Sequence, residues 1–310
     1  MWLSKISFRV AVVLAGLVLT VPGCEQHSEW EKHITEEEIV IPGVKGEYEL
    51  FYLTDTHAVI RHESDSEEVT EYATQRAAEF VNEEGVSSKQ IFSDWMDYAA
   101  EEEFDAILLG GDMIDFPSDA SMNYLDEELN KLPMPYLFNM GNHDWTYPWE
   151  YMTEAGEQTY RPLFEDYTDG QPSIHTWETE DLLVIAVDNS SEQVRPEVLE
   201  TYEQLLNTKK PVIVMVHVPL ITDSALSQSK KIWGVPMVLG GGNYGGIYPN
   251  EDSQAFMELT TAKDSPVELV LAGHVHFYNK DYIDGEKPVL QIIGDAGFHG
   301  GAVKLHISGE

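Results

Sequence analysis

Five short polar motifs along the chain carry side chains that can bind metal ions. A single Asp or His after an apolar run is usually a cap or a surface residue, but five such motifs in succession favour a shared site. Mixed Asp, Asn and His ligands suit Mn²⁺, Fe²⁺/Fe³⁺ or Zn²⁺. Seven ligands suit two ions that share a bridging carboxylate, at the ~3.5–4 Å spacing of two-metal hydrolases. The candidate ligands are Asp55, His57, Asp112, Asn142, His217, His274 and His276.

The stretch Gly141-Asn142-His143-Asp144 holds groups that metal binding alone does not need. Glycine allows a close backbone approach, and Asn142 offers a metal an oxygen without adding negative charge. His143 can act as a general acid, and Asp144 can orient its ring. Taken alone, such a stretch is more often a polar loop, so its weight depends on the other four motifs.

Short apolar strands must position these motifs. An apolar run precedes each motif, and helical patterns between several runs indicate a β-α-β order with a parallel-rich sheet. Functional groups gather at the carboxyl ends of the strands in such sheets. In an extended chain Asp55 and His57 would point the same way, which is a chelating arrangement. The runs are residues 49–53, 104–109, 136–138, 211–216 and 267–271.

Helical spacing predicts which face of one intervening segment is buried. Ser87 with Gln90 fits the capping box at the start of a helix, as does Ser64 with Glu67 further upstream. The apolar residues after Ser87 recur at helical spacing and should face the core. They are Ile91, Phe92, Trp95, Met96 and Ala99.

A second sheet is expected in the C-terminal half. Apolar runs at residues 173–177 and 182–188 predict a hairpin. We expect the terminal runs at 289–293 and 302–307 to close this second sheet. No internal repeat interrupts the chain, so we predict a single domain over residues 47–310.

The composition restricts the partners. The 310 residues include 55 acidic and 18 basic side chains, for a net charge of −37. Such a surface repels nucleic acid and anionic lipid headgroups, so nucleic acid is not expected as a partner. The Gly-rich residues 239–246 lack the Gly-Lys-Ser/Thr ending of a P-loop and predict a mobile loop near the site.

The N-terminal residues have the pattern of a targeting segment. Residues 1–23 have the pattern of a lipoprotein-type signal peptide, with an apolar run too short for the ~20 residues of a comfortable bilayer span. Cys24 is the only cysteine, and we expect it to be lipidated; an ordinary secretory signal with an incidental cysteine is the alternative. The acidic residues 24–46 predict a tether. The mature protein should be exported and anchored at the cell membrane or surface, without an intramolecular disulfide.

The order and residue types of the five motifs resemble those of the calcineurin-like metallophosphoesterase superfamily. Its pattern of Asp-x-His, Gly-Asp, Gly-Asn-His-Asp/Glu, a lone His and Gly-His-x-His is complete over about residues 48–307. The resemblance implies an α/β fold, a four-layer α/β/β/α sandwich in which helices flank two mixed β-sheets.

The resemblance also implies roles for the site residues. Asp55, His57 and His276 would hold the first metal ion. Asn142, His217 and His274 would hold the second, and Asp112 would bridge both. His143 would protonate the leaving oxygen or stabilise the transition state, with Asp144 orienting its ring.

One position departs from a branch of this superfamily. Purple acid phosphatases have a metal-binding Tyr three residues after the bridging Asp, where this chain has Asp115. A purple iron–tyrosinate site is therefore not expected. Asp115 is expected to support the site by hydrogen bonding or to cap a turn.

These observations predict an extracytoplasmic, dinuclear metal-dependent phosphoesterase. It would hydrolyse small phosphomonoesters or phosphodiesters by attack of metal-activated hydroxide. The motifs build the reaction centre and leave the pocket wall unspecified, so the substrate stays open. The alternatives are a phosphoprotein phosphatase and a non-catalytic metal-binding lipoprotein. The last is disfavoured because mere binding needs neither His143 nor Asp144.

Overall fold

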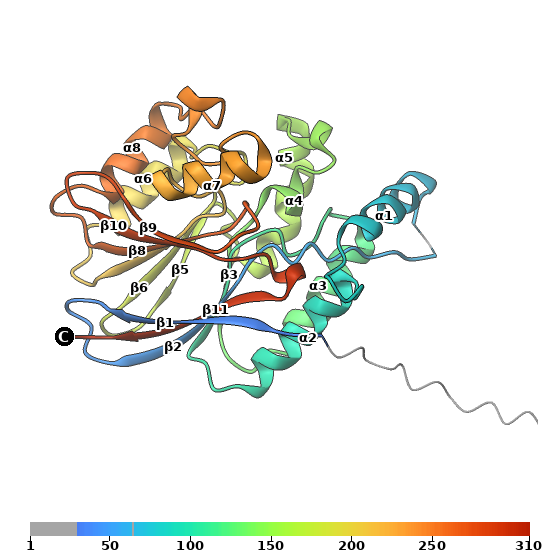
Figure 1. Cartoon of the computed structure of the whole chain (residues 1–310), viewed down its shortest axis with the longest axis horizontal. Helices are drawn as coiled ribbons and strands as arrows, with labels where there is room; N and C mark the ends of the chain where they lie inside the picture. Colours follow the sequence, from blue (N-terminus) through green and yellow to red (C-terminus); the bar gives the residue numbers. More distant parts are fainter. Residues whose placement is uncertain (1–29, 64) are drawn as a thin grey trace, which may run out of the picture.

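The computed structural model describes residues 30–63 and 65–310, so the predicted signal peptide and Cys24 lie outside it. Two β-sheets pack face to face, and helices cover their outer faces (Figure 1). Alternate side chains of one strand separate these layers. Leu50 and Tyr52 pack between the sheets, whereas Phe51 and Leu53 pack against the outer helices. The predicted four-layer sandwich is confirmed.

The first sheet is mixed and has five strands in the described part of the chain, in the order β1-β11-β2-β3-β4. Strands β2, β3 and β4 run parallel, so their carboxyl ends lie at one edge, and β11 runs antiparallel to β2. The strands are β1 (His33–Val40), β2 (Glu47–Leu53), β3 (Ala106–Leu109), β4 (Tyr136–Phe138) and β11 (Gly301–Ser308).

The second sheet has six strands among the described residues, in the order β5-β6-β7-β8-β10-β9. Strands β5 and β6 form the predicted hairpin, and β6, β7, β8 and β10 run parallel. The strands are β5 (Ile174–Glu178), β6 (Leu183–Val187), β7 (Val212–Met215), β8 (Val267–Ala272), β9 (Asn279–Ile283) and β10 (Val289–Ile293).

Helices fill the connections and cover the sheets. The predicted stripe of α2 is buried, and its N-cap Ser87 accepts a hydrogen bond from the Gln90 backbone at 3.3 Å. Ser64 is not described, and Ser66 caps α1 instead. In the described part of the chain, no helix has the length and apolar character needed to cross a membrane. The helices are α1 (Glu67–Glu79), α2 (Ser88–Glu101), α3 (Asp119–Leu129), α4 (Asn142–Trp145), α5 (Glu154–Tyr160), α6 (Pro196–Leu205), α7 (Asp223–Trp233) and α8 (Glu251–Thr260).

The predicted tether over residues 24–46 is wrong where β1 forms. Residues 33–40 pair in parallel with β11 along the whole strand. Strand β1 contains three glutamates, a residue type that is depleted in strands. It lies at an edge of the sheet, however, where charged side chains are tolerated and discourage further pairing. The partner strand lies near the other end of the chain, so no local pattern revealed it.

The predicted placement of residues 302–307 in the second sheet is also wrong. They belong to β11 and pair with β1 and β2 in the first sheet. Val303, Leu305 and Ile307 face the layer between the sheets, where they contact both. The apolar pattern indicated a strand, but it could not say which sheet the strand joins.

Candidate metal centre

The five motifs converge where strands of both sheets end. They directly follow β2, β3 and β4 of the first sheet and β7 and β8 of the second. His217 Nε2, after β7, lies 3.2 Å from Asp112 Oδ2, after β3. His276 Nε2, after β8, lies 3.3 Å from Asp55 Oδ1, after β2. The packing of the two sheets therefore brings together all seven candidate ligands.

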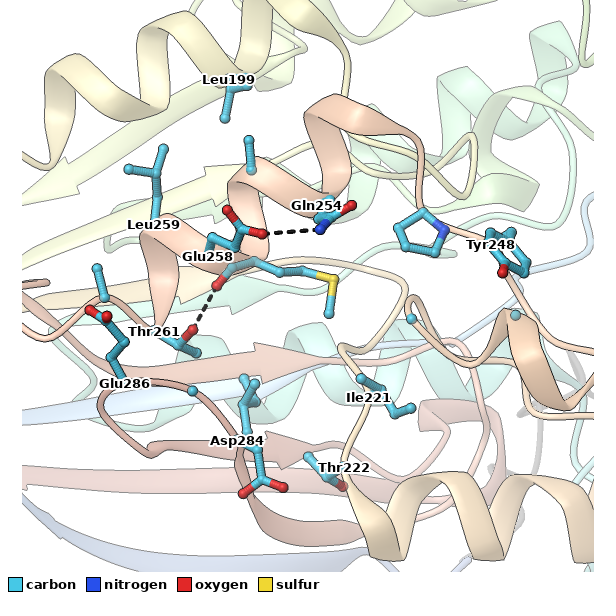
Figure 2. A pocket seen from close by; sticks show the side chains of 18 of the residues that line it. Leu199, Ile221, Thr222, Tyr248, Gln254, Glu258, Leu259, Thr261, Asp284 and Glu286 are labelled. Carbon is cyan, nitrogen blue, oxygen red and sulfur yellow. Dashed lines mark hydrogen bonds between the residues drawn. The ribbon is translucent and has the colours of Figure 1, made fainter.

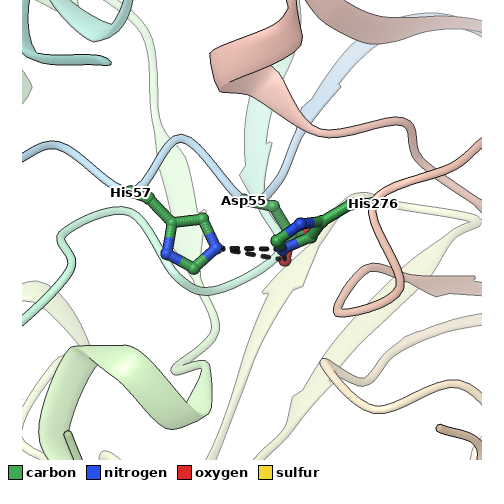
Figure 3. Close-up of side chains that lie close together, drawn as sticks. All are labelled: Asp55, His57 and His276. Atoms are coloured by element: carbon green, nitrogen blue, oxygen red, sulfur yellow. Dashed lines mark hydrogen bonds and ion pairs between the residues drawn. The ribbon is translucent and has the colours of Figure 1, made fainter. Parts of the chain in front are cut away.

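Asp55, His57 and His276 form what we call the first cluster, shown in Figure 3. The two imidazole rings point toward each other and toward the carboxylate, with their Nε2 atoms 3.1 Å apart. Asp55 and His57 are fully buried, and the His276 side chain is 16% exposed. Two ring nitrogens and a carboxylate oxygen that meet in this way form a potential ligand set.

Asp112, His217 and His274 form the second cluster. Asn142 adjoins it, with its Oδ1 at 2.9 Å from His274 Nδ1. Asp112 Oδ2 also lies 3.6 Å from His57 Nε2 of the first cluster. The Asp112 carboxylate is thus in reach of both clusters, which is the position a bridging ligand requires.

Two buried ring nitrogens fit the presence of metal ions. Nε2 of His217 and Nε2 of His274 have no hydrogen-bond partner in the structure. His217 Nδ1 lies 2.9 Å from the Gly110 carbonyl and carries a proton there, so Nε2 is the nitrogen that would bind a metal ion once its own proton is lost. Buried polar atoms are rarely left unpaired, and a metal ion would satisfy these two.

Five of the seven candidate ligands have a left-handed backbone. Their φ angles are 53° at Asp55, 43° at His57, 54° at Asp112, 71° at His274 and 56° at His276. Each such residue costs about 1–3 kcal/mol and persists only where its surroundings hold it. The extended geometry predicted for Asp55 and His57 is therefore wrong: a strained turn, not strand alternation, brings them together.

Glycines make room for these turns. A Cβ on Gly141 would lie 2.1 Å from Asp112 Oδ1, and one on Gly273 would lie 2.5 Å from Asp55 Oδ2. Cβ atoms are essentially never found this close to another atom. Glycine at these two positions therefore lets the carboxylates of Asp112 and Asp55 approach.

Asp144 does not contact the His143 ring, so its predicted role is wrong. Its Oδ2 accepts hydrogen bonds from the backbone of Gly141 at 2.7 Å and of Asp112 at 2.9 Å, and its Oδ1 accepts one from Ile114 at 3.2 Å. The carboxylate folds back onto the start of its own short helix. Burial and the charge of Asp112 raise the pKa of Asp144 to about 7. Asp144 thus links the motif that begins at Gly141 to the motif that contains Asp112.

Asp115 orients His143 instead. Its Oδ1 lies 2.9 Å from His143 Nδ1 and 3.2 Å from His57 Nδ1. The Arg76 guanidinium donates to both of its oxygens, at 2.6 and 2.9 Å. Burial opposes ionisation, but these hydrogen bonds hold the pKa of Asp115 well below its usual range. The predicted supporting role of Asp115 is confirmed.

Stacked rings support the same two histidines. His57 lies flat on Phe80 at 4.3 Å between ring centres, and His143 stacks on Tyr147 at 4.7 Å. Arg76 lies 4.6 Å from both aromatic rings. Sequence reasoning missed Arg76, Phe80 and Tyr147, because a lone arginine and scattered aromatic residues carry no motif.

Burial and neighbouring charges act differently on the histidines. Although burial opposes protonation, hydrogen bonds to Asp115 and Asp55 raise the pKa of His57 to about 10. Against the same burial, the charge of Asp112 raises the pKa of His217 to about 9. Burial and the neighbouring His217 lower the pKa of His274 to about 3. Among these three histidines, His274 is the one held neutral, the state that binds metal.

A cavity of about 1100 Å³ lies elsewhere, beside α8 (Figure 2). Leu199, Ile221 and Met257 contribute apolar walls, and none of the candidate ligands lines it. Gly240 and Gly242 do line it, so the Gly-rich loop borders this cavity. This cavity is therefore separate from the candidate metal centre.

Comparison with known proteins gives a family match. A family model for calcineurin-like phosphoesterases matches residues 50–278. No curated protein matches the chain.

Two solved structures align with most of the chain at low similarity. One is a dimetal phosphatase from Danio rerio, with 10% identity, a TM-score of 0.48, and coverage of 81% of this chain and 88% of that one. The other is a conserved uncharacterised protein from Streptococcus pneumoniae, described as a predicted phosphoesterase. It has 10% identity, a TM-score of 0.27, and coverage of 81% and 74%. These scores are too low to add to the family match.

Proposed function

Because the chain belongs to the calcineurin-like phosphoesterase family, we propose that its two clusters hold a dinuclear centre that hydrolyses small phosphomonoesters or phosphodiesters. The family makes the protein a hydrolase of phosphoester bonds with a metal centre. The observation that carries the dinuclear assignment is Asp112, whose carboxylate lies 3.2 Å from His217 and 3.6 Å from His57.

Each side chain has a distinct task in this proposal. Two bound ions would offset the negative charge of the phosphate oxygens and lower the pKa of water. Their local charge would also outweigh the acidic surface and admit an anion. Asp112 would contact both ions. Asp55, His57 and His276 would hold one ion, and Asn142, His217 and His274 would hold the other.

His143 supplies the proton for the leaving oxygen. Its backbone N–H donates to Asp112 Oδ1 at 2.7 Å, and its Nδ1 lies 2.9 Å from Asp115 Oδ1 and 3.3 Å from the Asp115 carbonyl oxygen. These contacts fix the ring and leave Nε2 as the nitrogen that can serve a substrate. The negative charge of Asp115 would stabilise the protonated form of the His143 ring.

The decisive experiment uses a soluble form that begins at residue 25. Mn²⁺, Fe²⁺ or Zn²⁺ is added in turn, and a chromogenic phosphodiester is assayed beside the matching monoester. Turnover should require metal and should vanish in Asp112→Asn. The ratio of the two rates then identifies the ester class. Absence of turnover on both esters, with two ions bound, would contradict the proposal for these small esters.

His143→Ala separates an enzyme from a metal-binding protein. An enzyme should lose turnover and largely keep its ions, since His143 is not among the proposed ligands. A variant that retains full turnover would remove His143 from the mechanism. Metal content is measured on the same samples.

The proposed location is outside the cytoplasm, with the chain anchored through lipid on Cys24. The support is the signal pattern of residues 1–23 directly before this single cysteine. Cys24→Ser should release the protein from the membrane fraction. Unchanged partitioning of that variant would refute the anchor.

A further inference from the structure

Two tryptophans at the metal centre are exposed to solvent. Trp149 is 53% exposed and Trp233 is 46% exposed. They lie at opposite ends of a row of imidazole rings, in which neighbouring ring centres are 4.6 to 5.5 Å apart. The order along this row is Trp149, His143, His57, His276 and Trp233. Exposed indoles at a reaction centre are candidates for substrate contacts, because tryptophan is among the side chains enriched at binding sites.

Trp149 stands next to the proposed proton donor. Its ring centre lies 5.1 Å from His143 and 5.1 Å from Tyr147, nearly perpendicular to both rings. Tyr147 is held in place between His143 and Arg76, at 4.7 and 4.6 Å. The exposed indole therefore rests against a fixed aromatic wall on the His143 side of the centre.

Trp233 occupies the other end. Its indole N–H donates to the Val275 carbonyl at 3.0 Å, and its ring centre lies 5.5 Å from His276. His276 belongs to the first cluster, so Trp233 borders a metal ligand and not the proton donor. The two tryptophans thus differ in the part of a substrate that each can reach.

We propose that Trp149 and Tyr147 bind a planar aromatic leaving group, so that the preferred substrates are esters of aromatic alcohols. This inference rests on the proposed function, because a His143 that protonates the leaving oxygen places the leaving group beside Trp149. Aromatic contacts of this kind add about 0.5–1.5 kcal/mol beyond area burial, which corresponds to about a two- to tenfold preference over a saturated ring. Trp149 is a specificity residue and takes no part in bond breaking.

The test compares benzyl phosphate with cyclohexylmethyl phosphate. Both release a primary alcohol of similar size, so the ratio of their kcat/KM values reports the aromatic contact more than bond reactivity. The metal-loaded wild type should favour benzyl phosphate about two- to tenfold. Trp149→Ala should bring the ratio close to one while cyclohexylmethyl phosphate is still hydrolysed, and Trp149→Phe should restore part of the preference.

Two matched variants serve as controls. Trp233→Ala removes an equally exposed indole at the other end of the row, and Tyr282→Ala removes an aromatic ring that is 57% exposed on β9. Both should keep the benzyl preference. Calorimetric binding of benzylphosphonate and cyclohexylmethylphosphonate, which are not hydrolysed, should show the same ratios without any turnover.

Different failures have different meanings. Equal rates and equal phosphonate affinities in the wild type, or a preference that survives Trp149→Ala, would overturn the aromatic wall. Loss of the preference in Trp233→Ala would place the leaving group beside Trp233 and not beside Trp149. That result would also overturn the proposal. Hydrolysis of neither ester would count against the proposed function, while the phosphonate affinities would still decide on the wall. An unchanged preference with weaker binding of Trp149→Ala to anionic vesicles would make the indole a membrane contact instead.

Discussion

The two metal-ligand clusters are held in place by different means. In the first, side chains support the ligands: Asp115 hydrogen-bonds His57, and Phe80 stacks on its ring. In the second, His217 is held by the Gly110 carbonyl, which its Nδ1 faces, and by the side-chain oxygen of Asn189, which accepts from its backbone N–H at 2.9 Å. The first cluster shares its support with His143 through Asp115, so one substitution there should affect metal binding and catalysis together.

When no metal is bound, each cluster contains one histidine with a raised pKa, His57 or His217, and one with a lowered pKa, His276 or His274. The Asp115 and Asp55 carboxylates, working against burial, raise the pKa of His57 to about 10, so this ring is protonated at neutral pH. Burial and the charge of His217 lower the pKa of His274 to about 3, so that ring stays neutral. The comparison teaches that one ligand must lose a proton to bind metal, whereas the other is already in its binding form.

The largest effect should come from the residue that both clusters share. Asp112→Asn keeps the shape of the side chain but removes the negative charge between His57 and His217. We expect turnover to fall to the background rate and the metal content to drop below two ions per chain. Elemental analysis beside the ester assay checks both. Retention of two ions and of turnover would mean that Asp112 does not bridge.

The next effect should separate the two kinds of support. Asp115→Asn should lower kcat about 10- to 100-fold, the usual cost of losing a supporting partner in a metal site, because His57 and His143 both lose their carboxylate. Asn189→Ala should act through the backbone of His217 and Val218, so metal affinity should fall while the His143-dependent step is kept.

A control for this pair is Asp181→Asn, which alters a carboxylate that accepts a backbone hydrogen bond from Gly46 at 3.0 Å outside the site. It should leave kcat and metal affinity unchanged. Identical profiles for Asp115→Asn and Asn189→Ala would erase the distinction between the clusters.

The metal-free protein should show opposite pH dependences for His57 and His274. A His57 pKa raised from 6.5 to about 10 stabilises the fold fully below pH 6.5, and this contribution is lost as pH rises toward 10. A His274 pKa lowered to about 3 contributes stability above pH 6.5 relative to acid, and this is lost as pH falls toward 3.

Thermal unfolding of chelator-treated variants measures this contrast. The Tm difference between wild type and His57→Asn should shrink as pH rises from 6.5 to 10. The difference between wild type and His274→Asn should shrink as pH falls from 6.5 toward 3. Parallel curves for the two variants would show that the charge difference between His57 and His274 is absent.

The smallest effect should come from Arg76, which supports the histidines indirectly, through Asp115 and through the rings of Phe80 and Tyr147. Arg76→Met removes the guanidinium that donates to both Asp115 oxygens but keeps an apolar stem against Phe80 and Tyr147. We expect kcat to fall by less than about tenfold, below the effect of losing Asp115 itself. Arg76→Lys, which retains the charge, should lose less. A loss larger than that of Asp115→Asn would give Arg76 a direct contact with substrate.

Sequence patterns predict the positions of the candidate ligands well and their conformations poorly. Apolar runs mark the strands, so the sequence alone assigns Asp55, Asp112 and His217 to strand ends. The left-handed backbone at Asp55 and His57 does not follow from these runs, since φ angles of this kind depend on hydrogen bonds from distant segments. The Asp55 backbone N–H, for example, donates to Gly111 at 2.9 Å.

The partner of His143 shows the same limit. Asp144 is its neighbour in the chain, yet Asp115 is its neighbour in space. A short helix turns the Asp144 carboxylate back to the amides at its start, which removes it from the ring. Sequence adjacency is therefore the wrong guide to this contact.

The sequence by itself determined the candidate donor set of this protein and the strands that carry it, because strand patterns and the motifs that follow them are local. The tertiary structure decided that β1 and β11 join the first sheet, that Asp115 and Arg76 support the site, and that Trp149 lies beside His143. Those outcomes depend on contacts between residues far apart in the chain. They arise only when two sheets pack and bring their strand ends to one place.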